Sequence, residues 1–361
     1  MSSPAIRRLR LRSHGLDQPR FATPAEVDAW FGAVQAQEYA HAKWALSLRL
    51  HATTDAALER AFNEGQILRT HVMRPTWHFV APADIRWLLE LTAPRVNLTN
   101  GHMYRQLELD DALFRRSNEV IERALAGGAQ LTREELGEAL GRAGIIASGM
   151  RLGYIVHRAE LDAVVCSGPR RGKRFTYMLL AERAPQARSL PREEALAELT
   201  RRFYTSHGPA TVDDFAWWSG LTKADVRLGI ELAGEAIAEE VIDGVRYWRA
   251  ASLQPAPETP TALLLPPFDE YTVAYRDHRA LLEPPFADQP TSVLFNGVVV
   301  IDGVILGAWR RSISGKSVQI EAMPFRPFTD AEREAFEAAA RRLGAFLELP
   351  AEVAVRESGQ P

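Results

Sequence analysis

The segment AVQAQEYAHAKWAL, residues 33–46, contains two glutamines, Gln35 and Gln37, directly after a stretch that is predicted to be helical. Glutamine is a poor acid and a poor base, but its side-chain amide carries two hydrogen-bond donors and an acceptor oxygen. Such a pair can hold a water molecule and direct its dipoles at a positive charge, but it cannot act as a strong base. The alternative is that both amides cap helix ends or bridge packed parts of the chain.

Two neighbours of the glutamines carry conventional chemistry. Glu38 follows Gln37 directly and could act as a general base, although nothing around it predicts burial. His41 lies one helical turn beyond Gln37 and could orient a water molecule. A single histidine on a helix is equally well explained as surface or as core.

A second group of polar and aromatic residues lies in the segment ILRTHVMRPTWHFVAP, which is predicted to form a hairpin. It contains Arg69, His71, Arg74, Trp77 and His78. No cysteine or carboxylate stands nearby at the spacing of metal ligands, so we predict no metal site here. Cations bind phosphates and an aromatic ring can stack on bases or wedge between them. We therefore expect the first four of these residues to contact DNA.

The segment PRRGKR, residues 169–174, carries four cations at the predicted tip of another hairpin: Arg170, Arg171, Lys173 and Arg174. The whole chain has a net charge of −3, which argues against a uniformly basic nucleic-acid binder. A local basic patch can still bind phosphates, and we predict that these four cations do so. The alternative is an ordinary solvated surface.

Two further pairs were considered for chemistry or packing. Asp269 and Glu270, in PFDEY, could form an acid–base pair, but in a strand they would point to opposite sides. Trp217 and Trp218 are consecutive in a predicted helix, so they cannot share a face. At least one of these tryptophans is therefore expected in the core.

Composition is that of an ordinary soluble protein of 361 residues, with 46% hydrophobic and 25% charged residues. The most apolar stretch, VLFNGVVVIDGVILGAW, is interrupted by polar residues and glycines, and we predict paired strands rather than a membrane span. The N-terminus lacks the apolar core of a secretory signal. The only cysteine, Cys166, excludes an intramolecular disulfide and favours the cytoplasm.

One order of elements repeats along the chain. LTREELGEALG (131–141) aligns with ATVDDFAWWSG (210–220), and in each a threonine N-cap precedes an acidic residue by three positions. A longer helix comes before each short one, at about 112–126 and 191–205, and a third helix and a hairpin follow. Three helices followed by a hairpin are typical of a winged-helix module.

A looser third copy begins the chain, with helices at about 24–34, 40–50 and 54–64 before the hairpin that contains Trp77. From about residue 256 the sequence is rich in proline and then strand-like, and an amphipathic helix capped by Thr329 closes it. We predict a mainly α fold with β-wings (α+β), built from three tandem winged-helix modules and a C-terminal β-rich region packed on the third. The predicted domains span residues 1–108, 109–185, 186–255 and 256–361.

Four segments occur in an order that resembles the AlkZ-like DNA glycosylases: GAVQAQEYAHAKWAL, ILRTHVMRPTWHFVAP, LLPPFDEYTVAYRDHR and NGVVVIDGVILGAWRR. The resemblance covers nearly the whole chain and implies three winged-helix modules arranged as a C-shaped cradle for DNA. Members of that family remove alkylated purines, and some unhook interstrand crosslinks. Their catalytic signature of glutamine, apolar residue and glutamine is matched by Gln35, Ala36 and Gln37. A related branch has aspartate at the last position, and this chain departs from that branch.

The resemblance implies a reaction that two amides can support without a cofactor. An N7-alkylated purine already carries positive charge, so it leaves as a neutral base while the sugar approaches an oxocarbenium ion. The protein then needs only to position water and stabilise the sugar, and one such contact contributes ~2–4 kcal/mol. We therefore predict excision of cationic adducts, chiefly N7-alkylguanine, from double-stranded DNA, and poor activity on neutral lesions.

The main alternative is a non-catalytic winged-helix DNA-binding protein, such as a transcription regulator, because one fold serves many functions. A chain that keeps the fold but has lost the activity is a third possibility. Three modules in one chain can clamp DNA without dimerising, so we expect a monomer. No separate segment for dimerisation or ligand sensing is evident, which favours the glycosylase.

Overall fold

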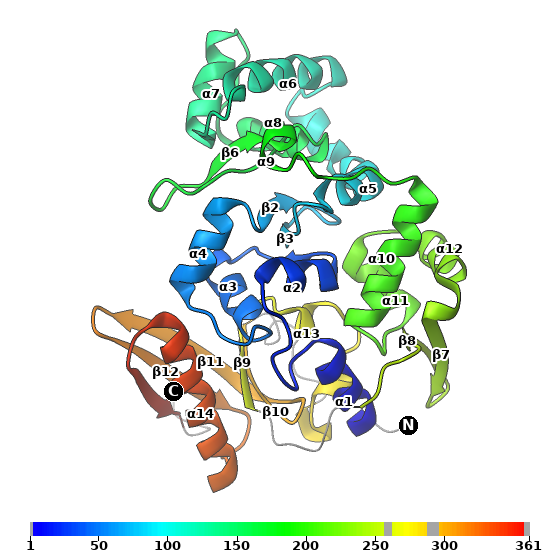
Figure 1. Cartoon of the computed structure of the whole chain (residues 1–361), viewed down its shortest axis with the longest axis vertical. Coiled ribbons are helices and arrows are strands. Elements are labelled where there is room, and N and C mark those ends of the chain that lie inside the picture. The colour runs from blue at the N-terminus through cyan, green and yellow to red at the C-terminus, as the bar shows by residue number, and fades with distance from the viewer. Residues whose placement is uncertain (1–2, 256–261, 287–295, 357–361) are drawn as a thin grey trace.

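The computed structural model describes residues 3–255, 262–286 and 296–356. Helices alternate with small, mostly antiparallel sheets, which confirms the predicted α+β class. In Figure 1 the helices α6–α8 lie at the top, α2–α4 at the centre, α10–α12 at the right and the largest sheet at the lower left.

The first module consists of three helices and a three-stranded sheet: α2 (Pro24–Phe31), β1 (Val34–Gln35), α3 (Tyr39–Ser47), α4 (Asp55–Glu64), β2 (Leu68–His71) and β3 (Trp77–Val80). The sheet order is β1-β3-β2, with antiparallel neighbours. Helix α2 ends three residues earlier than predicted because Gly32 adopts a φ of 82°, which favours glycine. The chain is thereby released to form strand β1, which contains Gln35.

The second module repeats this order with α6 (Asp111–Leu125), β4 (Leu131–Thr132), α7 (Arg133–Arg142), α8 (Gly149–Leu161), β5 (Val165–Ser167) and β6 (Thr176–Leu179). Its sheet order, β4-β6-β5, matches that of the first module. The third module has α10 (Arg192–Ser206), α11 (Val212–Ser219), α12 (Lys223–Ala233), β7 (Ile237–Ile242) and β8 (Val245–Ala250). There Ala210 bridges Trp248 in place of a first strand. All three are consistent with winged-helix modules, and the exact domain boundaries stay a prediction.

The predicted threonine N-caps form as complete capping boxes, in which the threonine and an acidic residue three positions later satisfy each other's backbone N–H groups. The pairs are Thr23 with Glu26, Thr132 with Glu135, Thr211 with Asp214 and Thr329 with Glu332. Each of these helix N-termini depends on only four consecutive residues, which is why the sequence locates them well.

The remaining elements connect the modules or complete the C-terminal region. Helix α1 (Ser3–Ser13) precedes the first module, and α5 (Ile85–Gln106) connects the first module to the second. Helix α9 (Leu180–Arg183) closes the second module after β6, and η1 (Gly234–Ala236) lies between α12 and β7 of the third. The C-terminal region contains β9 (Ala262–Leu265), α13 (Glu270–Val273), η2 (Arg279–Leu281), η3 (Pro284–Phe286), β10 (Gly297–Ile301), β11 (Val304–Ser314), β12 (Ser317–Pro324), α14 (Asp330–Leu347) and β13 (Ala351–Val355). Its five strands are antiparallel except for β13, which runs parallel to β12.

The predicted packing of the C-terminal region on the third module is wrong for its sheet and its last helix. Helix α14 contacts α3 and α4 of the first module (Figure 1). Trp44 donates from Nε1 to the carbonyl of Leu264 at 2.6 Å, and its ring lies 5.2 Å from that of Phe346. An amphipathic pattern shows that a helix buries one face but not what covers that face. The segment around α13 does contact the third module, where Trp217 donates to the carbonyl of Val273 at 3.0 Å.

Most apolar side chains of the second module form a hydrophobic core of their own. The first and third modules share a larger core with the C-terminal sheet. Four second-module residues join this larger core, namely Leu161, Cys166, Leu180 and Ala184. The second module therefore has its own core and contacts the first module through β5 and helix α8, which both lie against β2.

Candidate functional site

Gln35 and Gln37 lie at the end of strand β1 in different environments. Gln35 pairs with His78 of β3 and is only 8% exposed, whereas the side chain of Gln37 faces solvent. The N–H of Ala36 donates to the carbonyl of Trp77 at 2.7 Å, so the segment stays attached to β3 until α3 begins. Residues two apart in a strand point to the same face, so the outward position of Gln37 results from the end of β1 at Gln35 and the bend that begins at Gln37.

The inward amide of Gln35 is fixed by two charged groups. Its backbone N–H donates to Oε1 of Glu270 at 2.6 Å, and its side-chain Oε1 accepts from Nη2 of Arg74 at 3.1 Å. An amide oxygen has two lone pairs, so Gln35 keeps acceptor capacity beside Arg74. Both the backbone and the amide orientation of Gln35 are therefore held from within the protein.

Glu270 connects the first module to the third. It is 1% exposed, and its Oε2 accepts from Nε1 of Trp218 at 2.8 Å and lies 3.4 Å from Nε2 of His207. Burial acts to raise the pKa of this carboxyl, but the hydrogen bonds from His207 and from the Gln35 backbone hold the pKa below its ordinary value. Glu270 is thus a buried carboxylate directly beside Gln35.

The strand predicted for PFDEY is wrong. Asp269 caps the short helix α13, and its carboxylate binds Arg49 with two hydrogen bonds of 2.9 Å. Asp269 and Glu270 are both buried, each with its own cationic or hydrogen-bonding partners, and do not form an acid–base pair. The sequence signal for their role is two adjacent acidic residues in an apolar segment, because buried carboxylates need partners.

Arg69 is buried beneath the Gln35–Gln37 segment and binds its backbone, instead of facing solvent. It is 5% exposed and donates from Nε to the carbonyl of Ala36 at 3.0 Å and from Nη2 to that of Gln37 at 3.4 Å. Its guanidinium lies 4.2 Å from the ring of Trp77 and 4.6 Å from that of Phe175. Burial lowers the pKa of Arg69 to about 10, so the group stays charged.

The exposed amide of Gln37 borders a cavity of about 360 Å³ between the first and second modules. The N–H of Trp77 donates to Oε1 of Gln37 at 3.4 Å, which directs the amide along this wall. Cations outnumber acids around the cavity, whose lining includes Arg133, Glu134, Lys173 and Arg174. We call this the glutamine cavity. Its charge suits a phosphate backbone.

His71 is occupied inside the protein. Its ring lies 3.8 Å from that of Trp77, and Nδ1 is 2.6 Å from Oε2 of Glu160. Burial, with Arg69 and Arg133 nearby, lowers the pKa of His71 to about 3, and burial raises that of Glu160 to about 8. At neutral pH the contact is therefore a hydrogen bond from a protonated carboxyl to a neutral imidazole. His78 is also buried and donates from Nδ1 to the carbonyl of Thr76 at 3.0 Å.

The four cations of the loop between β5 and β6 divide into two groups. Arg170 pairs with Glu59 at 3.2 Å and Arg171 pairs with Glu135 at 2.7 Å. Lys173 and Arg174 are exposed and form no ion pair within the described ranges. These two are therefore available for an external anion.

The other residues considered from the sequence have simpler roles. Burial, with Arg311 nearby, lowers the pKa of His41 to about 4, so its ring is neutral at pH 7. Glu38 is exposed and precedes α3 without capping it through its side chain. Trp218 is fully buried while Trp217 is 44% exposed, which confirms that the two do not share a face.

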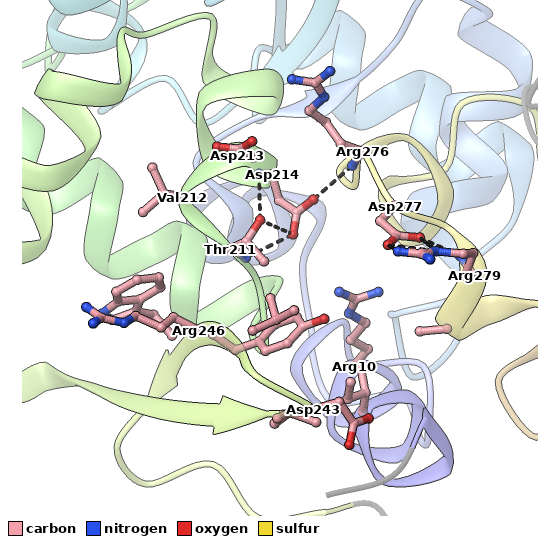
Figure 2. A pocket seen from close by; sticks show the side chains of 16 residues that line it. Arg10, Thr211, Val212, Asp213, Asp214, Asp243, Arg246, Arg276, Asp277 and Arg279 are labelled. Atoms are coloured by element: carbon pink, nitrogen blue, oxygen red, sulfur yellow. Dashed lines mark hydrogen bonds and ion pairs between the residues drawn. The ribbon is translucent and has the colours of Figure 1, made fainter.

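A larger cavity, about 740 Å³, lies elsewhere, between the third module and residues 276–280 (Figure 2). Its acids are largely satisfied from within: Asp214 binds Thr211 and the backbone of Arg276, and Asp277 pairs with Arg279 at 2.5 Å. Although this cavity is larger, neither glutamine lines it. The smaller glutamine cavity is therefore the candidate site, and Gln37 is the glutamine that lines it.

The described part of the chain contains neither a membrane-spanning helix nor a metal-binding cluster. Among residues 3–255, 262–286 and 296–356, no helix has both the length and the apolar character needed to cross a membrane. Within the same ranges, no cluster of three or more histidine, cysteine or acidic side chains is arranged to hold a metal ion.

Comparison with known proteins finds relatives that match almost the whole chain. The chain is 24% identical over 352 residues to a protein from Streptomyces sahachiroi named "Interstrand DNA cross-link repair glycosylase", covering 90% of each. Its fold matches the structure of Streptomyces sahachiroi DNA glycosylase AlkZ with a TM-score of 0.81 and 22% identity, covering 98% of this chain and 99% of the other. The family model for DNA glycosylase AlkZ-like proteins matches residues 29–346. This chain therefore belongs to the AlkZ-like DNA glycosylase family.

Proposed function

We propose that this protein hydrolyses the N-glycosidic bond of cationic alkylated purines, chiefly N7-alkylguanine, in double-stranded DNA. The observation that supports it best is the placement of Gln37, whose exposed amide borders a cation-lined cavity while its backbone is held by Arg69. An amide at this position can hold a water molecule beside a damaged nucleotide whose backbone is bound by the surrounding cations.

The chemistry proposed for the two glutamines follows from their environments. The departing base brings its own positive charge and needs no proton, so water attacks a sugar that approaches an oxocarbenium ion. The amide oxygen of Gln37 accepts a hydrogen bond from that water. Gln35, fixed by Arg74 and Glu270, supplies the second dipole. A fixed polar contact of this kind contributes ~2–4 kcal/mol to transition-state stabilisation.

The partners that we propose follow from the same geometry. Lys173 and Arg174 bind phosphates of a duplex, and a single chain suffices because three modules surround the DNA. The similar protein from Streptomyces sahachiroi is named for crosslink repair. We extend our proposal to interstrand crosslinks attached through a cationic purine, acted on at the chromosome in the cytoplasm.

The test is a duplex oligonucleotide with one N7-methylguanine, incubated with protein and then cleaved at abasic sites by alkali. We expect the native protein to excise the base and Gln37→Ala to excise it much more slowly. The Gln35→Ala/Gln37→Ala double variant should show no excision. Gln66→Ala, at an exposed glutamine outside the cavity, is the matched control. Excision of uracil as fast as of N7-methylguanine contradicts the proposed chemistry. Sequence-selective binding to undamaged DNA without excision identifies a regulator instead.

A further inference from the structure

A second cavity, of about 630 Å³, adjoins the glutamine cavity and shares Trp77, Arg133 and Glu134 with it. It lies between helix α8 of the second module and the hairpin β2–β3 of the first, and α8 lies above β2 in Figure 1. We call it the α8 pocket. Because these three residues line both cavities, the α8 pocket lies directly beside the cavity that Gln37 borders.

One side of the α8 pocket is a row of aromatic and imidazole rings, while Arg133 and Glu134 line the side that it shares with the glutamine cavity. The ring of His71 lies 3.8 Å from that of Trp77 and 4.2 Å from that of His157, and Tyr154 extends the row at 6.3 Å from His157. Burial lowers the pKa of His71 to about 3 and that of His157 to about 4, so both rings are neutral at pH 7. Such a surface favours a flat, uncharged group.

A glycine keeps the pocket open. Gly153 lies in the interior of α8, where glycine is less favourable than alanine. A Cβ added at Gly153 would meet no heavy atom within 4 Å in the described part of the chain, so packing does not require glycine there. The missing side chain leaves space in the cavity that Gly153 lines.

The pocket also contains a polar atom without a partner. His157 is 8% exposed, and its buried Nε2 has no hydrogen bond within the described residues. An unsatisfied buried nitrogen is unfavourable, and a ligand that can exchange a hydrogen bond with it would relieve this cost. The neighbouring aromatic rings and the open space at Gly153 fit the same ligand.

We propose that the α8 pocket binds the substituent carried by the alkylated base and that it favours flat, neutral groups larger than methyl. This proposal rests on the proposed glycosylase function. The pocket's volume lies within the range of about 300–1,000 Å³ that is typical of small-molecule sites. Adduct size is thus selected by a surface of the second module, separate from the glutamines of the first.

The test compares excision of N7-methylguanine and N7-benzylguanine from the same duplex by single-turnover kinetics. Leucine in Gly153→Leu fills the pocket and is a good helix former. Gly153→Ala keeps most of the space, and Gly141→Leu, at an exposed site on α7 with equally open surroundings, controls for a leucine elsewhere. We expect Gly153→Leu to slow benzyl excision at least about tenfold relative to methyl excision. In both controls the ratio of the two excision rates should equal that of the native protein.

The outcomes separate this inference from the proposed function. The pocket assignment is overturned if Gly153→Leu slows excision of both lesions equally, or slows excision of neither. It is also overturned if the native protein excises the methyl adduct but not the benzyl adduct. If the native protein excises neither, the proposed function fails. Binding of the two duplexes to native and Gly153→Leu protein then still decides the pocket. His157→Phe, which keeps a ring but removes the free nitrogen, provides a second variant should Gly153→Leu not fold.

Discussion

The carboxylate of Glu270 accepts the backbone N–H of Gln35 at 2.6 Å, although 235 residues separate the two in the sequence. The same carboxylate accepts from Trp218 of the third module. A residue of the C-terminal region therefore fixes the backbone of a glutamine in the first module and ties it to the third. The orientation of Gln35 depends on how these three parts of the chain assemble.

Replacing Glu270 with glutamine tests this link. The variant keeps the shape but removes the negative charge that Arg74 and His207 face, and breaking a buried charge network typically costs about 3–5 kcal/mol. We expect urea unfolding at lower denaturant and slower excision by the folded protein. The control variant Glu64→Gln, at an exposed site, should change neither the urea midpoint nor the excision rate. Native stability in Glu270→Gln would contradict the role of its charge.

Arg74→Met tests the orientation of the Gln35 amide. Methionine keeps much of the apolar stem but removes the donor to Gln35 Oε1, so we expect the single-turnover excision rate to fall about 10- to 100-fold. Duplex affinity should change little, because the guanidinium binds Gln35 and lies 5.7 Å from the ring of Trp217. Lower affinity with an unchanged rate would instead make Arg74 a DNA contact.

Glu160 predicts a specific dependence of stability on pH. Burial raises its pKa to about 8 in the folded protein, above the ordinary value near 4.5. The folded state therefore binds the proton more tightly, so this stabilisation is complete below about pH 4.5 and is lost as pH rises through 8. The rings of His71 and His157 have folded pKa values of about 3 and 4, so near pH 6.5 they titrate only in the unfolded chain, and they do so equally in a variant at position 160. Arg69 stays charged throughout this range.

Comparing native protein with Glu160→Gln between pH 6.5 and 8 isolates this effect. We expect the native free energy of unfolding to fall by about 1–2 kcal/mol more than that of the variant over this interval. Thermal or urea unfolding at several pH values measures it. Parallel pH profiles would mean that Glu160 is ionised in the folded protein.

Lys173 and Arg174 predict the salt dependence of DNA binding. Each phosphate contact contributes about 0.9 to the slope of log affinity against log salt concentration, so Lys173→Ala/Arg174→Ala should lower the slope by about 2. Arg201→Ala, which removes an exposed arginine on α10 that pairs with Glu198, is the control. Fluorescence anisotropy with an undamaged duplex measures the slope. An unchanged slope in the double variant rules out this loop as a phosphate contact.

The sequence predicts features that depend on neighbouring residues and misses those that depend on assembly. The threonine caps and the order of helices and hairpins follow from short patterns, and these were predicted correctly. The sequence does not predict which way the hairpin cations point. Arg69 donates to the backbone of Ala36 and Gln37, and Arg74 donates to the side chain of Gln35. These partners lie more than thirty residues away in the sequence. Glu270 is a still more distant partner, and a one-dimensional pattern contains no signal for its contact.

Helix α8, which belongs to the second module, lies against the hairpin that supports the glutamines of the first. The residues proposed to perform hydrolysis and those proposed to accept the adduct thus occupy separate folding units that meet along one wall. On these two proposals, natural variation or laboratory engineering of α8 changes which adducts are excised and leaves the hydrolytic step intact.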